Sequence, residues 1–207
     1  GPRGLEVPWS AAADVHAAEH LMAPLAPLGL RRPRFDLDLA VSAPARTRAA
    51  ARWADADRRL LVWLGPWAAE QPGPFLRAGF EIAEVDPEAR IVVGGPPSSK
   101  AAAKAMARSL GARAVATTPK AFSAAAALFA EADLVVADDD DPLQLALLSG
   151  RPALALFVHK DPLRWGPPRT DARQRILQPR PDAGRDLAYA RLVGHHAVEL
   201  WGTACAR

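Results

Sequence analysis

The chain has 207 residues, and because 50% of them are hydrophobic it can build the core of one large domain or two small ones. Its formal net charge is +3, and no apolar run approaches the roughly 20 residues that a membrane-spanning helix needs. The single cysteine, Cys205, excludes an internal disulfide and fits a reducing compartment. We therefore expect a cytoplasmic protein without a membrane span.

The start of the chain, Gly1-Pro2-Arg3-Gly4, lacks the apolar core of a signal peptide. Gly1-Pro2 resembles the scar that remains after a protease removes a tag, so residues 1–13 are expected to be a linker or tag-derived. A single domain is expected over residues 14–207, with its final helix at about 185–201.

Arginine supplies most of the positive charge, and the arginines are spread along the chain. A nucleic-acid-binding protein would concentrate such charge on one face and place aromatic residues among the basic ones. We interpret the arginines as parts of solvated helix faces and expect no nucleic acid among the partners.

The first elements along the chain are predicted from weak patterns. Apolar residues with helical spacing run over 14–28, where Pro24 and Pro27 shorten or break the helix. The alternating segment 33–39 predicts an edge strand, and the Ala/Arg-rich segment 44–54 predicts a helix that begins near Pro44.

From residue 60 onward, apolar runs alternate regularly with helical segments. Strands are predicted over 60–64, 90–93, 114–116, 133–136 and 153–157. Helices are predicted over 74–85, from Ser98 or Ser99 to Leu110, and over 119–131, 142–149 and about 185–201. The proline-rich stretch 162–181 is expected to be an irregular surface excursion. Strands that are apolar throughout and separated by helices imply an α/β, Rossmann-like parallel sheet with helices on both faces.

Four consecutive carboxylates, Asp138–Asp141, follow the strand at 133–136 and precede a helix. In open parallel sheets, ligands bind at the carboxyl ends of strands, and a helix start there usually accepts an anion. We interpret this acidic turn as a solvated helix start with Asp141 as the N-cap and Pro142 as the first helical residue. Two alternatives are a divalent-metal site that bridges a phosphate and an acidic patch that binds a partner.

Several motifs resemble, in order, those of one enzyme family. Val15–Glu19 with Leu28-Gly29-Leu30 is similar to its interdomain segment, and Ile91–Pro96 to its strand with a Gly-Gly-Pro turn. Ala132–Ala146 resembles its "ADLVVGNDTGPMHLA" stretch, and Ala153–Phe157 with Asp161–Pro167 resembles "VALFGPTDPxRWGP". The likeness covers about residues 15–170 and is to the C-terminal half of glycosyltransferase family 9, the ADP-heptose:lipopolysaccharide heptosyltransferase family.

That resemblance implies a GT-B architecture, in which two Rossmann-like domains enclose the active site. The C-terminal domain holds the sugar nucleotide, and the N-terminal domain supplies acceptor contacts and usually the catalytic base. It therefore implies an N-terminal domain or another protein as partner. No catalytic residue, metal ligand or cofactor is assigned to this chain; a sugar nucleotide is the expected substrate, with Mg²⁺ as an optional companion.

The resemblance assigns donor or nucleotide contacts to Asp139, Asp140, Asp141, Gln144, Gly94, Gly95 and Lys160. Asp139 matches the family's Asp, but Asp138, Asp140, Asp141 and Gln144 stand where the family has Asn, Thr, Gly and His. The loop after the strand at 60–64 lacks the family's Lys, and the Glu associated with the nucleobase falls near Ala124.

A diphosphate beside this acidic turn meets like-charge repulsion of about 1 kcal/mol or more for each close pair. We therefore predict a family 9-like domain that is catalytically degenerate. The alternative is a non-catalytic protein-interaction or scaffold module that kept the fold and lost donor binding. Adjacent helical positions point about 100° apart, so for His195 and His196 we expect one packed and one solvated ring rather than a metal site.

Overall fold

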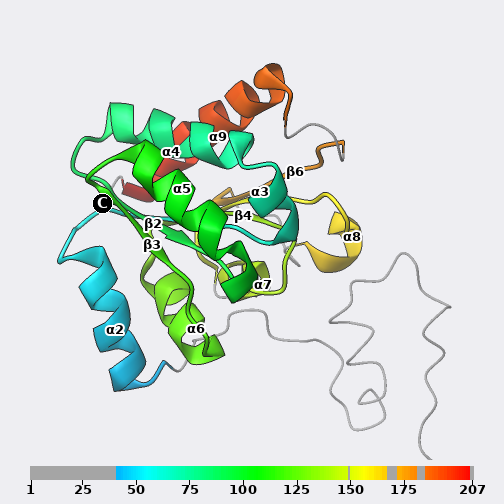
Figure 1. Ribbon diagram of the computed structural model, residues 1–207. Helices are drawn as coiled ribbons and strands as arrows, with labels where there is room; N and C mark the ends of the chain where they lie inside the picture. The colour runs from blue at the N-terminus through cyan, green and yellow to red at the C-terminus, as the bar shows by residue number, and fades with distance from the viewer. Residues whose placement is uncertain (1–40, 149, 167–171, 181–184, 206–207) are drawn as a thin grey trace, which may run out of the picture.

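A six-stranded parallel sheet forms the centre of the domain (Figure 1). The computed structural model describes residues 41–148, 150–166, 172–180 and 185–205; the helix predicted at 14–28 and the edge strand predicted at 33–39 lie outside them. In chain order the strands are β1 (Arg59–Trp63), β2 (Arg90–Gly94), β3 (Ala114–Thr117), β4 (Leu134–Asp138), β5 (Ala153–Leu156) and β6 (Gln174–Leu177). Their spatial order is β3-β2-β1-β4-β5-β6, and every neighbouring pair is parallel. The predicted α/β fold is confirmed.

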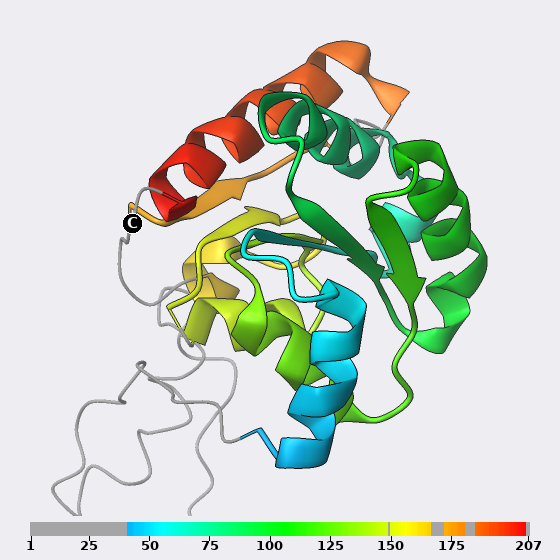
Figure 2. The same ribbon diagram turned by 90° about the vertical axis from the view of Figure 1, so that its left-hand side faces the viewer.

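Helices cover both faces of the sheet (Figures 1 and 2). One face packs against α4 (Gly73–Val85), α5 (Lys100–Leu110) and α9 (Leu187–Cys205), and the other against α2 (Ala43–Trp53), α6 (Phe122–Glu131) and α7 (Leu143–Leu148). Successive side chains of a strand point to opposite faces, so Leu60 and Val62 of β1 enter the first core while Leu61 and Trp63 enter the second. This is why the central strands carry uninterrupted apolar runs, such as Leu60–Trp63 in β1 and Leu134–Ala137 in β4.

Three short elements and some boundaries differ from the prediction. The stretch expected to be irregular contains α8 (Pro162–Trp165) and β6, and the loop after β1 contains α3 (Pro66–Glu70). Among the described strands, β6 has a neighbour on one side only. Its four half-buried residues include Gln174 and Arg175, so no apolar run marked it. The helix predicted from 119 begins at Phe122, and the final helix extends to Cys205. Ser99 precedes α5 as predicted, after the short 3₁₀ helix η2 (Pro97–Ser99), but its side chain makes no capping hydrogen bond.

All carboxyl ends of the strands lie at one edge of the sheet, because all six strands run in the same direction. The chain leaves β1 into α3, β4 into the acidic turn Asp138–Asp141, and β5 into the loop that leads to α8. None of the helices in the described segments has the length and apolarity needed to cross a membrane.

Candidate functional site

Asp138, the last residue of β4, turns its carboxylate into the protein. The residue is 1% exposed; Oδ1 accepts a hydrogen bond from the Gly65 backbone N–H at 2.9 Å, and Oδ2 accepts one from the Ala68 N–H at 3.0 Å. Burial raises the pKa of this carboxyl to about 6, although the two amides favour the charged form; Asp140 and Asp139 add to the rise. Asp138 therefore joins β4 to the turn between β1 and α3.

Asp139 is also buried, with 4% of its surface exposed. Its Oδ2 accepts hydrogen bonds from the backbone N–H groups of His159, at 2.7 Å, and of Lys160. Both donors belong to the loop after β5, so this carboxylate joins the ends of two neighbouring strands. The interpretation of the whole acidic turn as solvated is therefore wrong for its first two residues.

Asp140 and Asp141 form the outer half of the acidic turn. The N–H of Asp141 donates to Oδ1 of Asp140 at 2.9 Å, and Oδ1 of Asp141 lies 2.7 Å from Nζ of Lys160. The α7 helix begins at Leu143, so the residue before its first turn is Pro142 and the predicted N-cap role of Asp141 is wrong. The Asp141 side chain is 90% exposed and pairs with Lys160.

The structure gathers five of the seven predicted site residues at the carboxyl ends of β4 and β5. Gln144 donates from Nε2 to the carbonyl oxygen of Trp165 at 2.9 Å. Nζ of Lys160 lies 5.8 Å from the centroid of the Trp165 ring. With the contacts described above, this places Asp139, Asp140, Asp141, Gln144 and Lys160 in one region.

Gly94 and Gly95 lie elsewhere, at the end of β2, which is separated from β4 by β1. A Cβ on Gly94 would come within 2.7 Å of the Trp63 ring, and one on Gly95 within 2.8 Å of the Leu64 carbonyl oxygen. Both glycines are buried. The two positions therefore need glycine for close packing, whatever else they do.

The comparison with known families agrees with the fold and with the order of the motifs. Residues 20–186 match the family model described as glycosyltransferase family 9 (heptosyltransferase). The chain belongs to glycosyltransferase family 9. Among curated proteins, no match to this family 9 chain is found.

Solved structures of family members share the fold of this family 9 domain. A family 9 glycosyltransferase from Veillonella parvula is 16% identical with a TM-score of 0.65, and 91% of this chain covers 59% of that protein. The E. coli heptosyltransferase WaaC, solved with ADP, is 21% identical with a TM-score of 0.63, and 91% of this chain covers 58% of it. E. coli ADP-heptose lps heptosyltransferase II is 15% identical with a TM-score of 0.62, and 84% of this chain covers 58% of it. The chain thus spans less than two thirds of each of these proteins.

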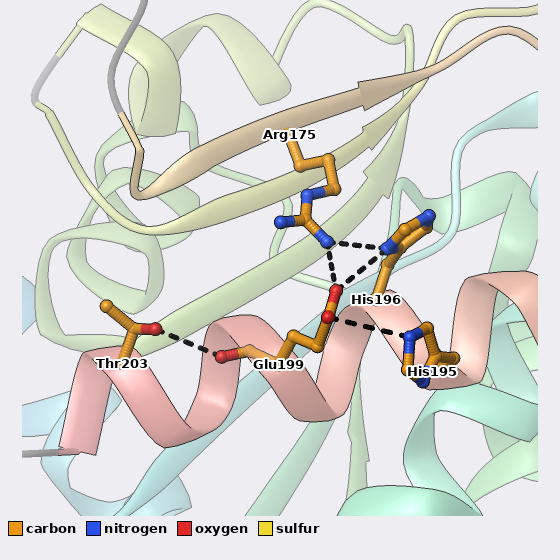
Figure 3. Close-up of polar contacts among 5 residues, drawn as sticks. All are labelled: Arg175, His195, His196, Glu199 and Thr203. Carbon is orange, nitrogen blue, oxygen red and sulfur yellow. Dashed lines mark hydrogen bonds and ion pairs between the residues drawn. The ribbon is translucent and has the colours of Figure 1, made fainter.

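A second polar cluster of the family 9 domain, on α9, was missed in part by sequence reasoning (Figure 3). Nε2 of His195 lies 3.5 Å from Oε1 of Glu199, and Nδ1 of His196 lies 3.1 Å from Oε2. Single ligand atoms of the three side chains lie within 4.8 Å of one another, a spacing that could hold a metal ion. Glu199 follows His195 by four residues and His196 by three, which is the spacing that could have revealed it.

Arg175 from β6 already occupies this His–Glu cluster (Figure 3). Its Nη1 lies 2.5 Å from Nδ1 of His196 and contacts Oε2 of Glu199. The hydrogen bond with His196, and after it the contact with Arg175, lower the pKa of the Glu199 carboxyl. The guanidinium thus supplies the positive charge that a metal ion would bring, and it ties the edge strand to α9.

Replacing Arg175 with glutamine should therefore increase the affinity of the domain for Zn²⁺. The substitution removes the repulsion between the Arg175 guanidinium and a Zn²⁺ ion beside His196 and Glu199. We expect Zn²⁺ to bind about tenfold more tightly, as measured by calorimetry at pH 7.5. Arg191→Gln removes an equal charge from an exposed position of α9 and is the matched control. Equal Zn²⁺ affinity in the two variants would contradict the role given to Arg175.

Proposed function

We propose that this chain is a family 9 domain whose donor site no longer accepts a nucleoside diphosphate, and that it acts without transferring sugar on its own. The observation that carries the proposal is the outer half of the acidic turn, where the Asp141 amide donates to the carboxylate of Asp140. The family resemblance puts Thr and Gly at these two positions, in the loop that meets the donor's phosphates. Here the same positions present two carboxylates.

The backbone amides around this turn support the proposal. The N–H groups of Gly65 and Ala68 donate to Asp138, and those of His159 and Lys160 donate to Asp139. The Lys160 ammonium pairs with Asp141. These amides, which follow β1 and β5, therefore already have carboxylate acceptors within the protein. A phosphate could accept hydrogen bonds from them only by displacing the buried carboxylates of Asp138 and Asp139.

A competing function keeps the family chemistry. The exposed Asp141 and the half-buried Asp140 are hard oxygen ligands, and a divalent cation bound to them could bridge to the phosphates of a sugar nucleotide. Family 9 relatives such as WaaC are solved with ADP, and they are longer than this chain. In this version the chain would be the donor half of an inverting glycosyltransferase and would need an N-terminal half for the acceptor and the base.

In the non-catalytic version the fold serves as an interaction or scaffold module, and its partner is a protein. The hydrogen-bonded interior of the acidic turn favours this version, because Asp138 and Asp139 hold neighbouring loops in place instead of receiving a ligand.

Restoring the family residues should create donor binding. We expect wild-type protein to bind ADP and ADP-heptose with a dissociation constant above about 1 mM, with or without Mg²⁺. Asp140→Thr with Asp141→Gly removes two negative charges and frees the amide at position 141, so ADP affinity should rise at least about tenfold in calorimetry.

The control variant changes the same residue types far from the turn. Asp55→Gly with Asp57→Thr alters two exposed carboxylates before β1, and its ADP affinity should equal that of wild type. Tight ADP binding by wild type that requires Mg²⁺ and disappears in the Asp140/Asp141 variant would favour the transferase version instead.

A further inference from the structure

A basic pocket lies beside the edge strand β3, far along the sheet from the acidic turn. It has a volume of about 620 Å³ and lies between α2, α5, the end of β3 and the start of α6. The helices α2 and α6 that form one wall lie side by side (Figure 2). Five cationic side chains line it, together with the hydroxyl-bearing Thr117 and Thr118: Arg48, Arg52, Lys100, Lys104 and Lys120.

None of these five cations has an anionic partner among the described residues. Across the described ranges, the side chains of the five form no ion pair or hydrogen bond, and the residues that line the pocket include no carboxylate. Other basic residues do find partners, as Arg58 does with Asp86 and Arg77 with Glu81. The arginines that we expected on separate solvated faces are therefore partly gathered, because α2 brings Arg48 and Arg52 toward the lysines of α5.

We propose that this pocket binds a small ligand that carries several phosphate groups. Like charges held together around a concavity repel one another, and an anion with several charges removes that cost. Arginine and lysine are the side chains that bind phosphate most often, and the two threonine hydroxyls can donate to the remaining oxygens. The lining also includes the apolar residues Ala116, Ala121, Ala124 and Leu128.

The dimensions and the lining favour a small molecule over a polymer. Pockets for small ligands measure about 300–1,000 Å³, and this one falls within that range. None of the described lining residues is aromatic, so the pocket has no side chain on which the bases of a single-stranded nucleic acid could stack.

The positive charge of the basic pocket also exceeds what the family resemblance requires at this place in the fold. That resemblance puts a nucleobase near Ala124, which lines the pocket, and a neutral base does not need five cations. The inference therefore stands on the pocket itself, and it holds whether or not the acidic turn accepts a diphosphate.

Inorganic tripolyphosphate is the probe that tests the pocket. In calorimetry at about 150 mM salt we expect a dissociation constant below about 1 mM for wild type. Arg48→Gln with Arg52→Gln should weaken binding at least tenfold. The matched control, Arg185→Gln with Arg191→Gln, changes two exposed arginines near and on α9 and should bind like wild type.

Each result decides the matter. No binding by wild type, or an equal loss in both variants, would overturn the proposal, because the second result means unspecific attraction to net charge. Tighter binding of a single-stranded oligonucleotide or of a glutamate-rich peptide than of tripolyphosphate would also overturn it. ADP binding that Asp140→Thr with Asp141→Gly gains, and that Arg48→Gln with Arg52→Gln leaves intact, belongs to the acidic turn and tests only the proposed function.

Discussion

Replacing Asp138 with asparagine should change the free energy of unfolding in a pH-dependent way, from a slight loss of stability near pH 4 to a gain of stability near pH 7. Burial raises the pKa of Asp138 from 3.8 to about 6, so the folded protein holds a proton at this site that the unfolded chain has already released. Between these two values the folded state binds more protons than the unfolded state, and stability therefore falls as the pH rises. Below about pH 4 the carboxyl is protonated in both states and this loss is absent.

A shift of about two pKa units corresponds to about 3 kcal/mol of stability lost by neutral pH. Asparagine carries no charge to bury, and its Oδ1 can still accept from Gly65, although the hydrogen bond from Ala68 is lost at a cost of about 1 kcal/mol. The variant should thus be slightly less stable than wild type near pH 4 and more stable by about 2 kcal/mol at pH 7 and above.

Urea unfolding of both proteins at half-unit pH intervals measures this difference. Asp57→Asn is the matched control, because that side chain is exposed and the substitution should leave the pH profile unchanged. A constant difference between Asp138→Asn and wild type across the whole pH range would contradict a raised pKa at position 138.

The sequence was sufficient for the parallel sheet because its strong signals are local. β1, β2, β4 and β5 are runs of consecutive apolar residues that enter both cores, and each is followed by a helix. β6 escaped prediction because an edge strand needs fewer apolar residues, and half of Gln174–Leu177 is polar. The start of α6 shifted by a few residues, because Pro119 offered a helix start that the backbone did not use.

The candidate site was predictable in position but not in the direction of its side chains. The strand before Asp138–Asp141 and the helix after it place the acidic turn at the carboxyl edge of the sheet, and the structure agrees. Asp138 turns inward to accept hydrogen bonds from the amides of Gly65 and Ala68, about 70 positions earlier in the chain. Asp139 turns inward to accept one from His159, about 20 positions later. No local pattern carries that information. The basic pocket was missed for the same reason, since its cations come from three separate segments.

Replacing Gly65 with alanine should destabilise the domain by about 3–5 kcal/mol, because the added methyl group would meet a carboxylate that cannot move freely. The Cβ would lie 2.3 Å from Oδ1 of Asp138, which the N–H of Gly65 itself holds at 2.9 Å. The φ angle of Gly65 is −72°, a value that alanine adopts readily, so the effect is one of contact and not of backbone strain. Moving the carboxylate would break hydrogen bonds to a buried charge.

Gly202→Ala is the matched control for this prediction. Gly202 lies within α9, and a Cβ there would have no heavy atom within 4 Å, so alanine should stabilise the helix by up to about 1 kcal/mol.

The decisive measurement repeats Gly65→Ala in an Asp138→Ala background, where the obstructing carboxylate is absent. The cost of the alanine should then shrink by at least about 1 kcal/mol, since residues in direct contact are energetically coupled. An equal cost in both backgrounds would mean that Gly65 and Asp138 do not constrain each other, and the inward-facing half of the acidic turn would lose its structural role.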